Sequence, residues 1–199
     1  MNADWTFDQA KSFFANILDY DISDLEGKSI LAVGSGTGAI HGVDMECRAI
    51  GLDPMYGDIG ASLDSSVTLV VGAGEMIPFQ QGTFDVVISH NVLDHVLNPI
   101  EVLEEINRVL DSDGTFLFTV NVFKLPRVVR DALNPIDKPH PHHFSPDEVR
   151  DLMRAAGFSI EMDDIREVPI QNMNLKALVA MNFFRLKRIH LRLTPSETS

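Results

Sequence analysis

The chain has 199 residues, of which 45% are hydrophobic and 8% aromatic, a composition that predicts one globular domain over residues 1–199 with a sizeable core. Its 16 basic and 29 acidic residues give a formal net charge of −13, which disfavours binding to a nucleic-acid backbone. No apolar run approaches the length of a membrane span, and the amino terminus lacks the pattern of a signal peptide. Since the single cysteine, Cys47, excludes an internal disulfide, we expect a cytoplasmic protein.

The first predicted element is a helix near the amino terminus, between Trp5 and Tyr20. Its apolar residues recur at helical spacing, namely at Phe7, Ala10, Phe13, Phe14, Ile17 and Leu18. A loop rich in Asp then leads to the first strand.

The most informative stretch is an apolar run that starts at Ser29 and breaks into three glycines at alternate positions, Gly34, Gly36 and Gly38. Glycine accepts a positive φ and has no side chain to keep a ligand away, and the N–H groups that open the next helix favour an anion. The turn therefore predicts a nucleotide-type cofactor. Because Ala39 follows, the pattern also fits the dinucleotide fingerprint of a nicotinamide-dependent oxidoreductase.

A second strand is predicted from Arg48 to Leu52, and Asp53 follows it directly. For either cofactor, this carboxylate is suited to accept hydrogen bonds from two ribose hydroxyls. The alternative is a turn residue that precedes Pro54. The interval between Gly38 and Asp53 is short for a full intervening helix.

Further along the chain, Phe84 to Ser89 is apolar and β-branched, as expected for a strand that is covered on both faces. Pro99 opens an amphipathic helix that would cover the sheet. Asp113-Gly114 would then turn the chain into another buried strand, Thr115 to Val120.

Residues 124–146 contain five prolines and three histidines, which predicts an irregular loop. A helix is expected after it, with Ser145 as the side-chain cap and Pro146 in the first turn. Gly157 is a suitable left-handed cap at the end of this helix.

Taken in order, these blocks resemble a class I S-adenosylmethionine-dependent methyltransferase with a Rossmann-like, methyltransferase type 11-like domain. The resemblance runs from about Lys28 to Phe158 and rests on ILAVGSGTG, AIGLD, GAGEMIPFQQGTFDVVISHNVLDHV, NPIEVLEEINRVLDSDGTFLFTV and HHFSPDEVRDLMRAAGF. It implies an α/β fold of three layers, in which a mostly parallel seven-strand-type sheet has helices on both faces and an antiparallel edge hairpin. A nicotinamide enzyme would share only the first two blocks.

The resemblance also implies a site for S-adenosyl-L-methionine, which becomes S-adenosyl-L-homocysteine after methyl transfer. The glycine loop would hold the methionyl end, Asp53 the ribose, and the segment after the third strand the adenine. The N-terminal helical segment, residues 1–27, would cap this site. The implied cofactor-binding residues are Gly34, Ser35, Gly36, Thr37, Gly38, Asp53, Pro54, Ala73, Gly74, Glu75, Met76, His90 and Asn91.

The candidates for removing a proton from the methyl acceptor are His90, Asp94, His95 and His143. The last of these lies with His140 and His142 in the loop of residues 124–146, which is expected to cover the substrate pocket. For Asp94 and His95 the alternative is a structural role, in which the pair orients the helix after the fourth strand. No metal is predicted, because adjacent histidines rarely give a metal-binding geometry and no carboxylate cluster accompanies them.

The chain departs from the family pattern at two acids. Relatives commonly have an acid where Ala32 stands, and an Asp where Ala73 stands, which would bind the adenine amino group. That contact must then come from backbone, water or Glu75. Just after the glycine turn, His41 is expected on a helix surface.

Residues 175–193 contain five basic and no acidic side chains, interleaved with apolar ones. This basic amphipathic C-terminal segment could contact an anionic membrane or a lipid-linked substrate. The alternative is a terminal helix or strand that packs its apolar side on the sheet.

The sequence therefore predicts S-adenosylmethionine-dependent methyl transfer to a small-molecule or lipid- or sugar-linked metabolite, with nucleic acid disfavoured as a partner. The replaced acids at Ala32 and Ala73 leave a catalytically degenerate binding or scaffold protein as the first alternative. A nicotinamide-dependent oxidoreductase is the second.

Overall fold

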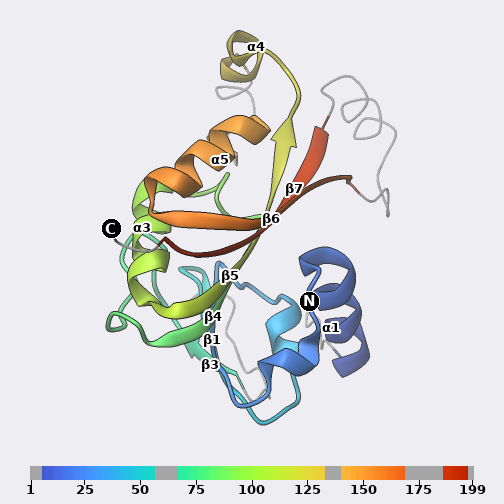
Figure 1. Cartoon of the computed structure of the whole chain (residues 1–199), viewed down its shortest axis with the longest axis vertical. Helices are drawn as coiled ribbons and strands as arrows, with labels where there is room; N and C mark the ends of the chain where they lie inside the picture. Colours follow the sequence, from blue (N-terminus) through green and yellow to red (C-terminus); the bar gives the residue numbers. More distant parts are fainter. Residues whose placement is uncertain (1–5, 57–66, 133–139, 169–185, 197–199) are drawn as a thin grey trace.

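A seven-stranded sheet forms the centre of the protein in the computed structural model, which describes residues 6–56, 67–132, 140–168 and 186–196. The strand order is β3-β2-β1-β4-β5-β7-β6 (Figure 1). Five strands are parallel, namely β1 (Ser29–Val33), β2 (Arg48–Leu52), β3 (Thr68–Val70), β4 (Phe84–His90) and β5 (Leu110–Phe123). The strand β7 (Leu186–Pro195) runs antiparallel to both β5 and the edge strand β6 (Phe158–Glu167). The predicted α/β fold class is confirmed.

Helical elements cover both faces of the sheet and complete the three layers (Figure 1). One face carries α3 (Pro99–Val109) and α5 (Pro146–Ala155), whose apolar residues share a core with Phe84, Phe116 and Phe158. The other face carries α1 (Phe7–Phe13), the π-helix Phe14–Leu18, and the 3₁₀ helices Ile22–Leu25 and Ala39–Gly42. The short 3₁₀ helix after β1 confirms that the Gly38–Asp53 interval lacks room for a full helix.

Both ends of α5 form as the sequence predicts. The Ser145 hydroxyl accepts a hydrogen bond from the N–H of Glu148, and the Glu148 carboxylate accepts one from the N–H of Ser145. Gly157 follows the helix with a φ of +83°, which a glycine adopts without strain. These caps fix where the loop before α5 enters the helix.

Two predicted element boundaries were wrong. The strand β5 begins at Leu110, before Asp113-Gly114, because Phe84 already pairs with Leu110 and the register shifts before Val86 pairs with Thr115. The four residues between these pairs are accommodated as an irregularity within one strand. The loop of residues 124–146 contains a short helix, α4 (Arg127–Asp131), and its residues 133–139 lie outside the described part of the chain.

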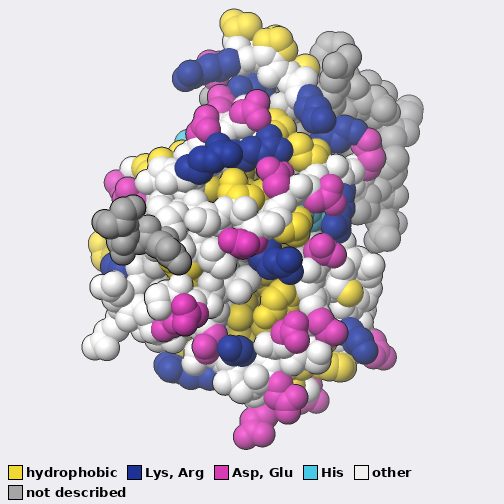
Figure 2. Space-filling model, in the orientation of Figure 1, with side chains coloured by type: hydrophobic (Ala, Val, Ile, Leu, Met, Phe, Trp, Pro, Cys, Tyr) yellow, Lys and Arg dark blue, Asp and Glu magenta, His cyan; other side chains and the backbone are white. Residues whose placement is uncertain are grey.

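Residues 186–193, the described part of the basic amphipathic C-terminal segment, belong to the strand β7, which agrees with the predicted alternative of a terminal helix or strand packed on the sheet. Ile189, Leu191 and Leu193 are buried between β5 and β6 and alternate with basic side chains. Residues 175–185 lie outside the described residues. On the face shown in Figure 2, basic side chains are interspersed with acidic ones. Among the described helices, none is long and apolar enough to cross a membrane.

Candidate active site

The turn after β1 is held by backbone hydrogen bonds and one carboxylate. The N–H groups of Gly34 and Ser35 donate to the carbonyl of Leu52, over 2.8 and 3.3 Å. Gly34 has a φ of +64°, and a Cβ at this position would lie 2.5 Å from a methyl carbon of Val92. The Asp53 carboxylate accepts from the N–H of Gly36 over 2.9 Å. Asp53 therefore both supports the turn and borders the space above it.

His41 packs onto the glycine turn, which corrects its predicted place on a helix surface. Its Nε2 lies 2.9 Å from the carbonyl oxygen of Gly36 and 3.4 Å from the Tyr56 hydroxyl. Burial lowers the pKa of this imidazole. The Tyr56 hydroxyl also lies 2.5 Å from the Ser35 hydroxyl, so Ser35 has a partner within the protein.

A cavity of about 560 Å³ opens at the carboxyl ends of β1, β2 and β4. The sequence-predicted residues that line it are Gly34, Asp53, Pro54, Ala73, Gly74, Glu75 and Asn91. Asn91 adopts a φ of +57°, and its buried side-chain oxygen has no hydrogen-bond partner in the described structure. An unpartnered buried acceptor is costly unless a ligand or water satisfies it. The cavity is therefore bordered by the carboxylate residues Asp53 and Glu75 and by the amide residue Asn91.

A second cavity of about 240 Å³ lies beside the first, and both are lined by Val33 and Gly34. Its wall also contains Phe13 and Phe14 from the N-terminal helical segment and His90 from the end of β4. Ser35 and Gly38 line this cavity as well, whereas Thr37 and Met76 line neither of the two. The two cavities meet at the glycine turn.

His90 is a largely buried, neutral side chain at the end of β4. Its Nδ1 lies 2.6 Å from the Thr119 hydroxyl, and its ring meets Phe13 edge to face with 4.9 Å between the centroids. Burial, followed by the positive charges of Arg188 and His190, lowers the pKa of His90 to about 4. The imidazole is therefore uncharged near neutral pH, and it is a weak base.

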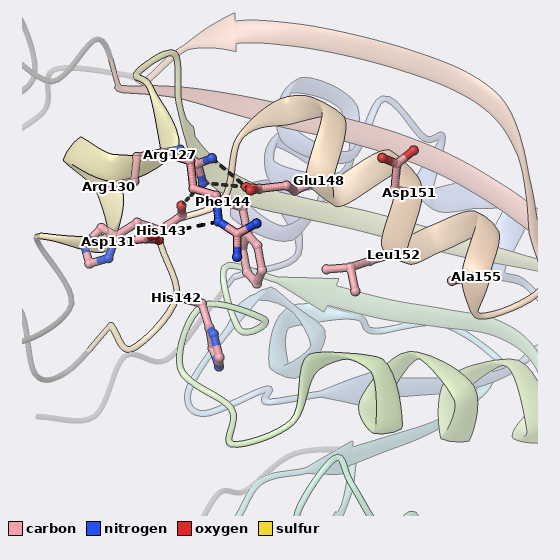
Figure 3. A pocket seen from close by; sticks show the side chains of 10 residues that line it. All are labelled: Arg127, Arg130, Asp131, His142, His143, Phe144, Glu148, Asp151, Leu152 and Ala155. Atoms are coloured by element: carbon pink, nitrogen blue, oxygen red, sulfur yellow. Dashed lines mark hydrogen bonds and ion pairs between the residues drawn. The ribbon is translucent and has the colours of Figure 1, made fainter.

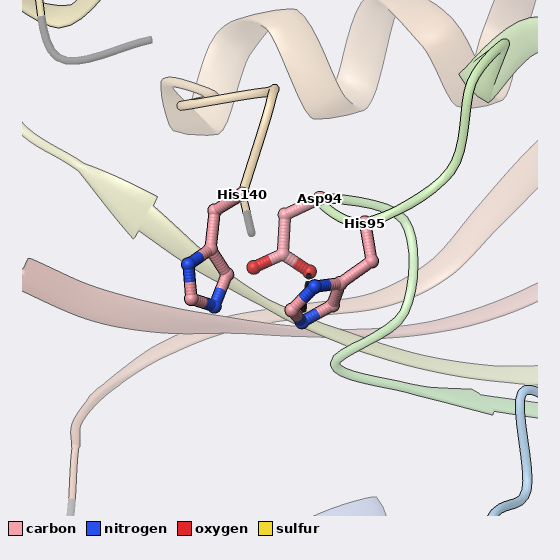
Figure 4. Close-up of side chains that lie close together, drawn as sticks. All are labelled: Asp94, His95 and His140. Atoms are coloured by element: carbon pink, nitrogen blue, oxygen red, sulfur yellow. Dashed lines mark ion pairs between the residues drawn. The ribbon is translucent and has the colours of Figure 1, made fainter. Parts of the chain in front are cut away.

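Asp94, His95 and His140 converge just after β4 (Figure 4). Their ligand atoms all lie within 4.8 Å of one another, and the rings of His95 and His140 are 4.4 Å apart. Asp94 is buried, its Oδ1 has no hydrogen-bond partner, and its closest approach to His95 Nε2 is 3.8 Å. Burial raises the pKa of Asp94, while the neighbouring imidazoles of His95, His140 and His143 act in the opposite direction.

A third cavity of about 500 Å³ lies between α4 and α5, and His143 belongs to this one (Figure 3). The buried Arg130 guanidinium donates to the His143 carbonyl over 2.5 Å and to both oxygens of Glu148 over 2.5 and 2.9 Å. The hydrogen bonds from Arg130 lower the pKa of Glu148 to about 2. The His143 ring packs against Phe123, so His143 is separate from the two cavities at the glycine turn. The sequence did not predict the role of Arg130, because its partner Glu148 could be recognised there only as a capping residue of α5.

Glu75 is engaged by the start of α3. One of its carboxylate oxygens accepts from the N–H groups of Leu97 and Asn98, over 2.9 and 3.3 Å. Asn98 makes no side-chain cap of its own, so Glu75 satisfies N–H groups at the helix entrance. These two hydrogen bonds hold Glu75 at the wall of the larger cavity.

Comparisons with known proteins agree with this architecture. A family model described as a methyltransferase domain matches residues 31–118, which include the glycine turn, Asp53 and β4. The chain is 30% identical over 173 residues to a malonyl-[acyl-carrier protein] O-methyltransferase of Geobacter sulfurreducens, covering 72% of this chain and 61% of that protein. Residues 31–118 form a domain of the S-adenosylmethionine-dependent methyltransferase family.

Other methyltransferases show the same relation in sequence and fold. A sarcosine/dimethylglycine N-methyltransferase of Aphanothece halophytica is 32% identical over 106 residues, which are 47% of this chain and 38% of that protein. A solved S-adenosylmethionine-dependent methyltransferase from Mesorhizobium loti superposes with a TM-score of 0.65 at 16% identity, covering 94% of this chain and 99% of the other. This methyltransferase chain spans about 40 to 60% of the length of the two curated relatives.

The cofactor of this family is S-adenosylmethionine, and the larger cavity of this methyltransferase fits its polar parts. The Asp53 carboxylate and the unpartnered oxygen of Asn91 are acceptors for hydroxyl or amino groups. A Cβ at Gly74 would lie 3.1 Å from a methyl carbon of Val102, so a larger residue there would require the Val102 side chain to shift by a few tenths of an ångström. The acids expected at Ala32 and Ala73 are absent, and both alanines border the cavities.

Proposed function

We propose that this chain transfers the methyl group of S-adenosylmethionine to a nucleophilic atom of a small-molecule acceptor. The observation that carries the proposal is the pair of cavities that meet at Gly34, with Asp53 on one side and His90 on the other. One cavity suits the ribose and adenine of the cofactor, and the other suits an acceptor of modest size.

Within this proposal, Asp53 holds the ribose by accepting two hydroxyl hydrogen bonds. Gly74 and the neighbouring backbone flank the adenine, and the side-chain oxygen of Asn91 accepts from a cofactor N–H or O–H group. The glycine turn borders the methionyl end through its backbone and small side chains, since the N–H groups of Gly34, Ser35 and Gly36 already donate to Leu52 and Asp53. Phe13 and Phe14 line the smaller cavity, which supports the proposed capping role of the N-terminal helical segment.

The chemistry of the bound cofactor is that of a sulfonium, which carries an already activated methyl group. The protein must align the acceptor with that methyl and exclude water. His90 is placed to do this, since it lines the smaller cavity and is fixed by Thr119 and Phe13. Because its low pKa keeps it neutral, it does not repel a cationic cofactor.

The activities of related proteins support a small acceptor. They include sarcosine/dimethylglycine N-methyltransferase and ubiquinone biosynthesis O-methyltransferase. The second cavity of about 240 Å³ is of a size that admits a metabolite or the end of a longer molecule.

The test is the formation of S-adenosylhomocysteine, measured by mass spectrometry, when the full chain is incubated with S-adenosylmethionine and a panel of amine, carboxylate and phenol acceptors. The proposal expects product that requires both acceptor and enzyme, and loss of product in Asp53→Ala. Saturable cofactor binding without product from any acceptor would instead favour the non-catalytic binding protein, for which the alanines at positions 32 and 73 are the supporting observation.

A further inference from the structure

One cluster of side chains is not used by the proposed cofactor site. Asp94 and His95 lie in the turn after β4, and His140 comes from the segment that leads into α5 (Figure 4). The three offer one carboxylate oxygen and two imidazole nitrogens within 4.8 Å of one another. This combination of one carboxylate and two imidazoles is a recurrent ligand set for divalent transition metals.

The carboxylate of this cluster lacks a hydrogen-bond partner at one oxygen. Asp94 has only 4% of its surface exposed, yet its Oδ1 accepts no hydrogen bond from the described residues. A buried oxygen of this kind costs free energy unless a proton donor or a cation satisfies it. Figure 4 shows the side chains of Asp94, His95 and His140 pointing toward a common space.

The approach of His140 is fixed by its neighbour in the chain. The N–H of His142 donates to the carbonyl of Asp94 over 3.4 Å, and His142 Nε2 lies 3.0 Å from the carbonyl oxygen of Val96. These two contacts hold residues 140–142 over the turn after β4 without using the three candidate ligands. The convergence is therefore built into the fold.

We propose that Asp94, His95 and His140 bind one divalent first-row transition-metal ion, with Zn²⁺ as a suitable probe. Ligand atoms on one such ion at about 2.1 Å lie at most about 4.2 Å apart, so small side-chain rotations would close the present spacing. Three protein ligands leave at least one coordination position for water or a substrate oxygen.

The location points to a role beside the cofactor. His95 lines the same cavity as Gly34 and Asp53, so the open position faces the proposed active site. There the ion could bind an oxygen of the acceptor and lower its pKa. This role rests on the proposed function, whereas metal binding by the cluster does not.

Arg188 is the competing counter-charge for Asp94. It interacts electrostatically with Asp94 from β7, but its Nε lies 3.3 Å from the side-chain oxygen of Asn121. If Asp94 only balances the positive charge of Arg188, Asp94→Asn will change the stability of the fold and leave metal binding unaltered.

The test is calorimetric titration of the metal-free full chain with Zn²⁺, together with Co²⁺ absorption spectroscopy, in the wild type and matched variants. The proposal expects one ion per chain and a ligand-field spectrum, with affinity at least about tenfold weaker in His140→Gln and in Asp94→Asn. His143→Gln is the control, since it removes an imidazole from the same segment whose ring packs against Phe123 and is not one of the three candidate ligands.

Binding that is equal in His140→Gln and His143→Gln, or no specific binding by the wild type, would overturn the proposal. Titration of the chelator-treated wild type with S-adenosylmethionine is run in parallel. Cofactor binding without metal binding would reject the metal site alone, and metal binding without cofactor binding would reject the proposed function alone.

Discussion

The cofactor side and the acceptor side of this active site are built from different kinds of groups. The cofactor side consists mainly of backbone, with glycines at positions 34, 36 and 74 and the carboxylate residues Asp53 and Glu75. The acceptor side consists of side chains from remote segments, including His90 at the end of β4 and His140 before α5. Function on the cofactor side is therefore impaired by substitutions that add atoms to a glycine. Function on the acceptor side is impaired by substitutions that remove a side chain.

This difference explains why one side is local in sequence and the other is not. The glycine turn and Asp53 are set by two adjacent strands and their hydrogen bonds to Leu52 and Gly36. The segment that carries His140 toward Asp94 leads into α5, and Arg130 joins α4 to α5 through the His143 carbonyl and Glu148. Substitutions on each side can separate the two contributions.

The largest effect is expected from Gly34→Ala. The added methyl would meet Val92 at 2.5 Å, and the backbone would remain at a φ of +64°. We predict that the affinity for S-adenosylmethionine falls more than about a hundredfold, or about 2.7 kcal/mol, in a calorimetric titration.

Gly27→Ala is the matched control for this substitution. Its φ is +72°, but a Cβ there has no neighbour within 4 Å. It carries a similar backbone cost of about 1–2 kcal/mol without the clash. Equal cofactor affinities for the two variants would show that the close approach at Gly34 does not matter, whereas partial recovery in Gly34→Ala/Val92→Ala would support it.

At the junction of α4 and α5, Arg130→Ala is expected to destabilise the fold by about 2–3 kcal/mol, measured by urea unfolding. The substitution leaves the buried His143 carbonyl without its donor and frees Glu148, which is partly exposed to water. Arg127→Ala is the control, because that side chain is 81% exposed and its ion pair with Asp131 contributes little. A stability loss as small as that of the control would contradict the importance of this junction.

A smaller and pH-dependent effect is expected from His90. Its folded pKa of about 4 lies below the ordinary value of 6.5, so the unfolded chain binds more protons between these pH values. Its contribution to stability is complete above about pH 6.5 and is lost as the pH falls toward 4. We predict that the wild type loses about 2 kcal/mol more than His90→Gln between pH 7 and pH 5. Parallel pH profiles for the two proteins would contradict the buried, neutral state of His90.

The elements of the cofactor side could be predicted because their determinants are contiguous. The bounds of β1 and β2, the caps of α5 and the position of Asp53 follow from apolar runs, capping residues and the glycine pattern. The strand β7 was harder, since alternating basic and apolar residues also suit an amphipathic surface helix, and only pairing with β5 and β6 decides between them.

The side-chain clusters could not be predicted for a related reason. His140 lies 45 residues after His95 and meets it only because His142 bonds to the backbone of Asp94 and Val96. The three loop histidines lie close together in sequence, but their backbone directs His143 toward Phe123 and away from His140's partners. Long-range hydrogen bonds of this kind leave no local pattern.

The most direct test of the central claim is calorimetric titration of S-adenosylmethionine and S-adenosylhomocysteine into the wild type, Asp53→Ala and Asp85→Ala. Asp85 is the matched control, because its carboxylate also accepts a strand N–H, that of Ser29, but it lines neither cavity at the glycine turn. The account predicts saturable binding in the wild type and Asp85→Ala, and at least about tenfold weaker binding in Asp53→Ala. Absence of binding in a folded wild type, or equal affinity in all three proteins, would contradict it.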